Sequence, residues 1–176
     1  MDGIIYRKPG EMKDSGINWL GEIPKSWDIT QLGYNAKMIV PMRDKPTSFN
    51  GDIPWIRIED FDGKYIEKSK SDQNVTKSLI KKMNLKIYPP GTVLCTCSCN
   101  LGTTAIVNRE LVSNQTFIGI VPQNNIYSDF LYYLMNSNAE RLQWMSIGAI
   151  QQYLSRDNYE KLKIQLPSLN EQYRIA

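Results

Sequence analysis

The chain has 176 residues, of which 41% are hydrophobic, and it carries 21 basic and 18 acidic side chains but no histidine. This length supports one sizeable core, so we expect a single domain with at most an appendage. The lack of histidine excludes the Ser/His/Asp triad and histidine-containing zinc sites, and the net charge of +3 permits a nucleic-acid partner without requiring one.

The N-terminal segment is polar and lacks the apolar centre of a signal peptide, and no run approaches the length of a membrane span. We therefore expect a cytoplasmic protein with no membrane partner. Residues 1–13 are predicted to form a tail. Between Asp14 and Trp27, two tryptophans and a leucine surround a turn, which suggests an aromatic-anchored strap packed on the domain.

Residues 28–40 are predicted to be a strand or the end of a helix, and residues 41–52 an exposed loop with two cations, Arg43 and Lys45. Residues 53–61 then alternate as in a strand with one polar edge. On that strand Arg57 shares a face with Trp55 and Glu59. Two roles for Arg57 stay open, because it could read a base or pair with Glu59 or another neighbouring acid.

Residues 76–87 fit a short helix with Thr76 as its N-cap and Leu79, Ile80 and Met83 on one side. Three lysines lie off this apolar stripe, at positions 77, 81 and 82. They are either a solvated face or phosphate contacts.

The stretch from Tyr88 to Gln115 predicts two strands joined by a polar turn. Val93, Cys95, Cys97 and Cys99 fall on one face of the first strand, because side chains alternate along a strand. The spacing of the cysteines differs from the loops that wrap zinc, and a fourth ligand is missing, so small buried strand residues are favoured over a metal-binding or reactive role. The turn at residues 100–104 surrounds Gly102.

Beyond this stretch, residues 114–122 predict a buried strand, and a helix is expected from Asp129 to about Met145. A short helix capped near Ser155, a strand over residues 162–167 and a helix starting at Ser168 complete the chain. A helix that begins so close to the last residue suggests that the natural chain, or its assembly, continues there.

Five segments of the sequence, taken together and in their order along the chain, resemble those of a known family. They are "DSGINWLGEIPKSW", "IPWIRIEDF", "PPGTVLCTCSCNLGTTAIV", "SNQTFIGIVP" and "GAIQQYLSRDNYEKLKIQLPSLNEQ". Together they resemble a target recognition domain of the DNA specificity (S) subunit of bacterial Type I restriction-modification enzymes. The resemblance implies an α/β (mixed α+β) fold, with a twisted mixed sheet flanked by short helices. Residues 14–167 would form the recognition domain and residues 168–176 the start of a long spacer helix.

The resemblance also implies a function: the chain reads one half of a bipartite double-stranded DNA target and performs no chemistry. Methyltransferase (M) and restriction (R) subunits would be its partners, and they would use S-adenosylmethionine, ATP and Mg. This chain would hold no cofactor. A second recognition domain in cis, or a second copy in trans, would read the other half-site.

Candidate DNA-binding residues follow from this reading. Cations could hold phosphates or guanine edges, and amides and hydroxyls could distinguish bases in the major groove. The candidates are Arg43, Lys45, Arg57, Asn100, Thr103, Thr104, Gln151 and Gln152. Gln151 and Gln152 could instead cap or bridge the last helix.

Two other classes of protein stay open, and the first is a small enzyme. An adenine methyltransferase needs Asn or Asp before Pro-Pro-aromatic, which residues 88–91 do not offer. A metal-dependent nuclease needs clustered carboxylates, and Asp60 and Asp62 with Lys64 come nearest but lack a distant acid. The remaining alternative is an interaction module that dimerises through its C-terminal helix.

Overall fold

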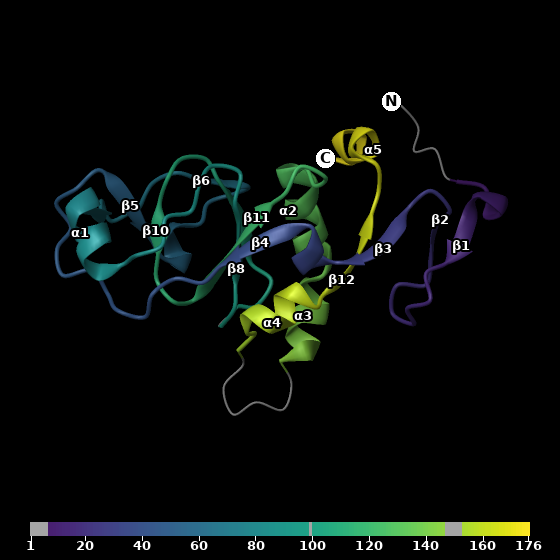
Figure 1. The fold of residues 1–176 in the computed structure, drawn as a ribbon, viewed down its shortest axis with the longest axis horizontal. Coiled ribbons are helices and arrows are strands. Elements are labelled where there is room, and N and C mark those ends of the chain that lie inside the picture. Colours follow the sequence, from purple (N-terminus) through teal and green to yellow (C-terminus); the bar gives the residue numbers. More distant parts are fainter. Residues whose placement is uncertain (1–6, 99, 147–152) are drawn as a thin grey trace.

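The computed structural model describes residues 7–98, 100–146 and 153–176. Its elements form an elongated molecule with a five-stranded sheet and its helices in the middle, a smaller module around α1 at one end and the β1–β2 pair at the other (Figure 1). This arrangement confirms the mixed α+β prediction, although the strands form four sheets. None of the helices in these ranges is both long enough and apolar enough to cross a bilayer.

The central sheet has the strand order β4-β11-β8-β9-β6. Its edge strand β6 runs parallel to β9 and the other pairs are antiparallel, so the sheet is mixed. The strands span Ala36–Ile39 (β4), Tyr65–Ile66 (β6), Val93–Thr96 (β8), Thr104–Val107 (β9) and Phe117–Pro122 (β11). The predicted strand pair of the central stretch therefore forms the middle of this sheet.

One face of the sheet is covered by helices. Val93, Cys95 and Cys97 lie in the same buried cluster as side chains of α2 and α3, as their alternation predicts, whereas Cys99 lies outside the described residues. The helix expected from Asp129 to Met145 is wrong in one respect, because it is two helices: α2 (Ser128–Ser137) and α3 (Ala139–Met145). At the junction, Asn138 donates its side-chain amide to the Leu134 carbonyl at 2.8 Å.

The module at one end consists of a three-stranded sheet and α1 (Lys77–Met83). Its strands are β10 (Val112–Ser113), β5 (Ile53–Ile56) and β7 (Asn74–Val75). The expectation of a strand with a polar edge over residues 53–61 is wrong, because all four residues of β5 are buried and the 3-10 turn η3 (Ile58–Asp60) follows. The N-cap prediction for α1 is confirmed, since Thr76 Oγ1 accepts from Leu79 N at 3.1 Å.

The other end is built from short pairs. The strands β1 (Met12–Asp14) and β2 (Glu22–Pro24) pair after the 3-10 turn η1 (Pro9–Glu11), and β3 (Asp28–Gln31) pairs with β12 (Lys163–Leu166). A further 3-10 turn, η2 (Leu32–Tyr34), follows β3.

The helix α4 (Arg156–Glu160) starts at the predicted Ser155 cap, and α5 (Leu169–Ile175) starts after Ser168. The proposed division between residues 13 and 14 falls within β1.

The two described cysteines are expected to be unreactive in the folded protein. Burial raises the pKa of Cys95 to about 12 and that of Cys97 to about 11, and the thiolate is the reactive form. In a Cys99→Ser variant, iodoacetamide at pH 8 should modify neither thiol until urea unfolds the chain, as mass spectrometry would show. Rapid modification of the native variant would contradict this burial. Both pKa values are raised above the ordinary value of 9.0, so the folded state holds these thiol protons more tightly than the unfolded state. The resulting contribution to the free energy of unfolding is fully present below pH 9.0 and falls as pH rises above it.

Candidate nucleic-acid interface

An open hollow of about 640 Å³ lies where separate segments meet beside the end of β8. Its walls come from the chain after β4, the end of β8, the loop between β10 and β11, and the approach to α4. The lining residues are Val40, Pro41, Arg43, Ser98, Gln115 and Tyr153. The sequence positions of these residues span more than half of the chain, so only the tertiary fold brings them together.

Main-chain bonds to Cys97 hold the walls of this hollow. The Cys97 amide donates to the Thr116 carbonyl at 2.9 Å, and the Cys97 carbonyl accepts from Leu154 N at 2.8 Å. The next residue, Ser98, forms a β-bridge with Tyr153. Because backbone groups make these contacts, the positions of the walls depend little on which side chains line the hollow.

The lining offers chemistry suited to nucleic acid. It combines an exposed guanidinium on Arg43, an exposed amide on Gln115 and a half-exposed tyrosine ring on Tyr153, and these six residues include no carboxylate. Arg43 forms neither an ion pair nor a side-chain hydrogen bond with any residue that the structure describes. Its charge is therefore available to a phosphate or a guanine edge.

Lys45 lies in the same exposed loop but is not part of the hollow's lining. Its ammonium group lies 5.7 Å from the ring centroid of Phe49 and 5.9 Å from that of Trp55. These are cation–π distances. Lys45 is thus oriented by the aromatic pair of the α1 module, with its charge still exposed.

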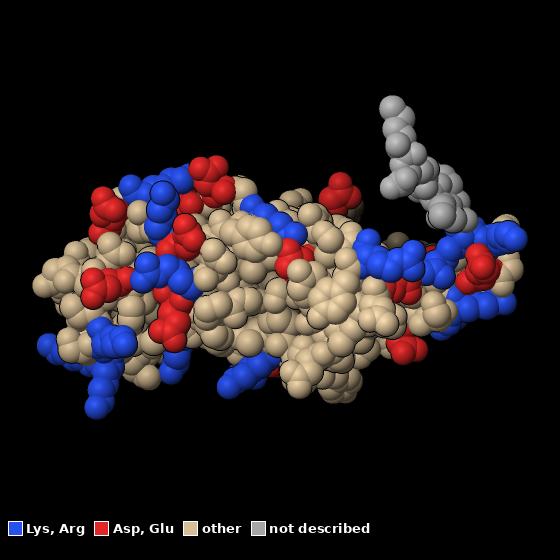
Figure 2. Space-filling view, turned by 90° about the horizontal axis from the view of Figure 1, so that it is seen from above, with Lys and Arg blue, Asp and Glu red and all other residues tan. Residues whose placement is uncertain are grey.

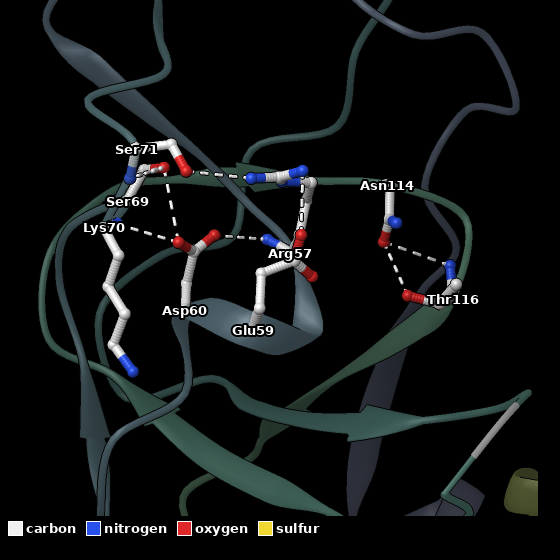
Figure 3. A network of polar contacts seen from close by, with 8 residues as sticks. All are labelled: Arg57, Glu59, Asp60, Ser69, Lys70, Ser71, Asn114 and Thr116. Atoms are coloured by element: carbon white, nitrogen blue, oxygen red, sulfur yellow. Dashed lines mark hydrogen bonds and ion pairs between the residues drawn. The ribbon is translucent and has the colours of Figure 1, made fainter.

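Arg57 is held in a polar network (Figure 3). Its Nη1 lies 2.8 Å from Glu59 Oε1 and its Nη2 donates to Ser71 Oγ at 2.9 Å. The salt-bridge alternative is therefore the one observed, and a base contact by Arg57 would compete with Glu59. Asp60 stabilises the turn beneath, because its carboxylate accepts from the amides of Arg57 and Lys70, each at 2.7 Å.

The β8–β9 turn presents only part of what the sequence suggests. Asn100 is exposed with a φ of +47°, and its carbonyl accepts from Thr103 Oγ1 at 2.9 Å. Thr104, by contrast, is 5% exposed within β9, so its hydroxyl does not reach the surface. The turn itself packs on α3, since a Cβ added at Gly102 would overlap the Cβ of Ala139.

The structure therefore separates the eight predicted residues. Arg43 lines the hollow, Lys45 and Arg57 lie beside Trp55, and Asn100 and Thr103 form the β8–β9 turn. Gln151 and Gln152 lie outside the described residues. Sequence reasoning missed Gln115 and Tyr153. A signal for Gln115 was present, because Asn114 and Thr116 flank it in the pattern of an Asx turn between two strands.

A second polar cluster joins β6 to α2. Lys64 Nζ lies 2.5 Å from Asp129 Oδ1, which also accepts from the Tyr65 hydroxyl at 2.7 Å. Burial tends to raise the pKa of Asp129, but the bonds from Lys64, Tyr65 and Tyr127 outweigh it and lower that pKa. This cluster is a structural tie between sheet edge and helix.

Charges of both signs are intermixed toward the two ends of the face seen in Figure 2, and its centre is mostly uncharged. This face thus offers no continuous basic surface. Within the described ranges, no three His, Cys, Asp or Glu side chains gather as potential metal ligands. Asp60 and Asp62 line a separate hollow together with Lys68 and Lys70.

The fold has solved counterparts. It resembles the HsdS subunit from Thermoanaerobacter tengcongensis with a TM-score of 0.66 at 18% identity, over 94% of this chain and 38% of that one. A chain solved in work on complex assembly and conformational transition of the type I R-M system gives a TM-score of 0.69 at 18% identity, over 95% of this chain and 40% of that one. At 18% identity these likenesses show the fold, which the chain shares with about two fifths of each solved chain.

Sequence comparison gives the family. Residues 28–176 match the model of the Type I restriction modification DNA specificity domain, and the chain belongs to this family. It is 33% identical to the MjaIX specificity subunit of Methanocaldococcus jannaschii over 98% of this chain and 41% of that relative. It is 30% identical to a putative specificity subunit of Haemophilus influenzae over 98% of this chain and 44% of that relative. The chain thus spans about two fifths of these relatives' length.

Proposed function

We propose that this chain is a DNA target recognition domain that reads one half of a bipartite target. The observation that carries the proposal is the hollow at the end of β8 in a member of a DNA specificity family. There a cation, an amide and an aromatic ring lie on loops that main-chain hydrogen bonds hold in place. Loops on a rigid sheet are a common way to hold recognition side chains. Apart from the buried Thr104, the candidates named from the sequence remain proposed contacts, with Arg43 the best placed.

The partners follow from the family. Methyltransferase and restriction subunits would carry out methylation and cleavage, with S-adenosylmethionine, ATP and Mg bound by those subunits. This chain would direct them to the target without performing chemistry. The curated relatives are named as specificity subunits, which supports this division of labour. Asp60, the nearest candidate for nuclease chemistry, has its carboxylate bonded to backbone amides of its own loops.

The direct test is selection of duplexes from a random DNA library by the purified chain, followed by anisotropy titrations on selected and scrambled duplexes at several salt concentrations. A binding module should enrich one short motif, bind it more tightly than scrambled DNA and lose affinity as salt rises. It should show no methyl transfer with S-adenosylmethionine and no cleavage with magnesium. Turnover by the isolated chain, or the absence of any enriched motif, would refute the proposal.

Arg43→Ala should weaken binding to both selected and scrambled duplexes. Removing one phosphate contact is expected to reduce the slope of log K against log salt by about 1. Arg174→Ala is the matched control, because Arg174 is an exposed arginine on α5. In Figure 1, α5 lies toward the upper edge, whereas α4, which follows the hollow-lining Tyr153, lies toward the lower edge. An unchanged salt slope in Arg43→Ala would show that Arg43 makes no phosphate contact.

Self-association through α5 is the second candidate. Tyr173 and Ile175 on this helix are 58% and 46% exposed, whereas the neighbouring Gln172 is fully buried. If α5 pairs two copies, sedimentation should give twice the 20.3 kDa of the chain, and Tyr173→Glu should restore the monomer mass. A monomer at all concentrations, with binding to a single half-site intact, would favour the recognition domain acting alone.

A further inference from the structure

We propose that Gln115 is a specificity-determining residue, and that its side-chain amide reads the major-groove edge of an adenine. This inference rests on the proposed function and makes it more specific. Gln115 was not among the candidates suggested by the sequence, and it is the amide side chain among the residues that line the hollow. A glutamine amide can pair with the N6 donor and N7 acceptor of adenine in a bidentate contact.

The loop that carries Gln115 is held on both sides of it. Upstream, Asn114 N donates to the Ile56 carbonyl at 3.3 Å, which ties the loop to β5. Downstream, the Thr116 carbonyl accepts from Cys97 N at 2.9 Å, which ties it to β8. Between these ties, Asn114 Oδ1 accepts from Thr116 N at 3.3 Å and from Thr116 Oγ1 at 2.6 Å (Figure 3). The backbone of Gln115 is thereby fixed before DNA arrives.

The Gln115 side chain is left available by the same arrangement. It is exposed, and the hydrogen bonds of the described residues use only its carbonyl, which accepts weakly from Cys97 Sγ at 3.6 Å. Both its amide donor and its amide acceptor can therefore meet a base without breaking a hydrogen bond to any residue that the structure describes. A fixed backbone with a free polar end lowers the ordering cost of such a contact.

Its neighbours complete the chemistry of a base-reading site. Tyr153 is 50% exposed and offers an aromatic surface, and Arg43 supplies a positive charge on the other wall. The other candidates are less well placed for base readout. Arg57 is paired with Glu59, the Thr103 hydroxyl is bonded to the Asn100 carbonyl, and Thr104 is buried.

The test compares base preferences across a set of matched variants. Random duplex libraries would be selected with the unmodified chain and with Gln115→Ala, Gln115→Glu and Gln123→Ala, with thermal unfolding of each checked first. Gln123 is the control, because it is also exposed and follows the end of β11, whereas Gln115 precedes its start. A bidentate contact contributes about 1–3 kcal/mol to discrimination between bases, which corresponds to roughly 5- to 150-fold.

The unmodified chain and Gln123→Ala should both prefer adenine at one position of the motif. Gln115→Ala should reduce that preference by at least about fivefold and leave the other positions within about twofold. Gln115→Glu should favour cytosine there, because a carboxylate accepts from cytosine N4. An enriched motif that Gln115→Ala and Gln115→Glu leave unchanged would overturn this assignment while the proposed function stands. No enriched motif with the unmodified chain would overturn both.

Discussion

Replacing Gly119 by alanine is expected to destabilise the protein by about 3 kcal/mol, near the upper end of ordinary overpacking costs. A Cβ at this position would overlap ring atoms of Tyr88, which is fully buried. The ring cannot move aside easily, because its hydroxyl accepts from Ser113 Oγ at 3.1 Å. The backbone is equally constrained, since β11 pairs here with Ile39 on one side and Leu94 on the other.

Urea unfolding of Gly119→Ala measures this effect. Gly10→Ala is the control, because a Cβ at Gly10 would meet no described atom within 4 Å beyond its own turn, and it should change the free energy of unfolding by less than about 0.5 kcal/mol. Adding Tyr88→Leu to Gly119→Ala should cost less than the sum of the two single changes, since the overlap is then gone. A loss below about 1 kcal/mol in Gly119→Ala would show that the sheet and ring can shift apart.

Gln172→Ala is expected to have an effect of similar size, about 3 kcal/mol. Gln172 is fully buried, and its amide nitrogen donates to the carbonyls of Asn125 and Pro167, both at 2.9 Å. Its amide oxygen accepts from Tyr127 N at 2.8 Å. Alanine would leave three backbone groups without their partner, and each unsatisfied buried group costs about 1–3 kcal/mol before relaxation.

Urea unfolding combined with hydrogen exchange distinguishes this local loss from a general one. The Tyr127 amide should lose protection in Gln172→Ala because its acceptor is gone, while the amides of β8 and β11 should remain the most protected. Asn170→Ala, at an exposed position of the same helix, should leave both readouts unchanged apart from a few tenths of a kcal/mol from helix propensity. Unchanged protection at Tyr127 would mean that water replaces the glutamine oxygen.

Local patterns predicted much of the fold because local physics determines those elements. The N-cap at Thr76 and the alternation through Val93, Cys95 and Cys97 each involve neighbours in sequence, and the structure confirms them. The error at β5 has a tertiary cause. Trp55 was expected on a polar face, but it is covered within the α1 module, so a strand with two buried faces replaces the alternating one.

The break between α2 and α3 escaped prediction because the apolar period continues across Asn138. What ends α2 there is a bond from the Asn138 side chain to a carbonyl one turn back. The candidate site was harder still. Arg43 was named correctly as an exposed loop cation, but its meeting with Gln115 and Tyr153 depends on contacts between distant strands. Periodicity within a single element carries no information about which residues of different elements come into contact.

The main-chain hydrogen bonds of Cys97 affect how the protein can evolve. Because amide and carbonyl groups position the Gln115 loop, almost any residue could occupy position 115 and be displayed in the same place. If position 115 reads a base as proposed, a single nucleotide change in the gene would alter the preferred DNA sequence while the fold persists. Such a scaffold would let a lineage of these proteins diversify its targets in small steps.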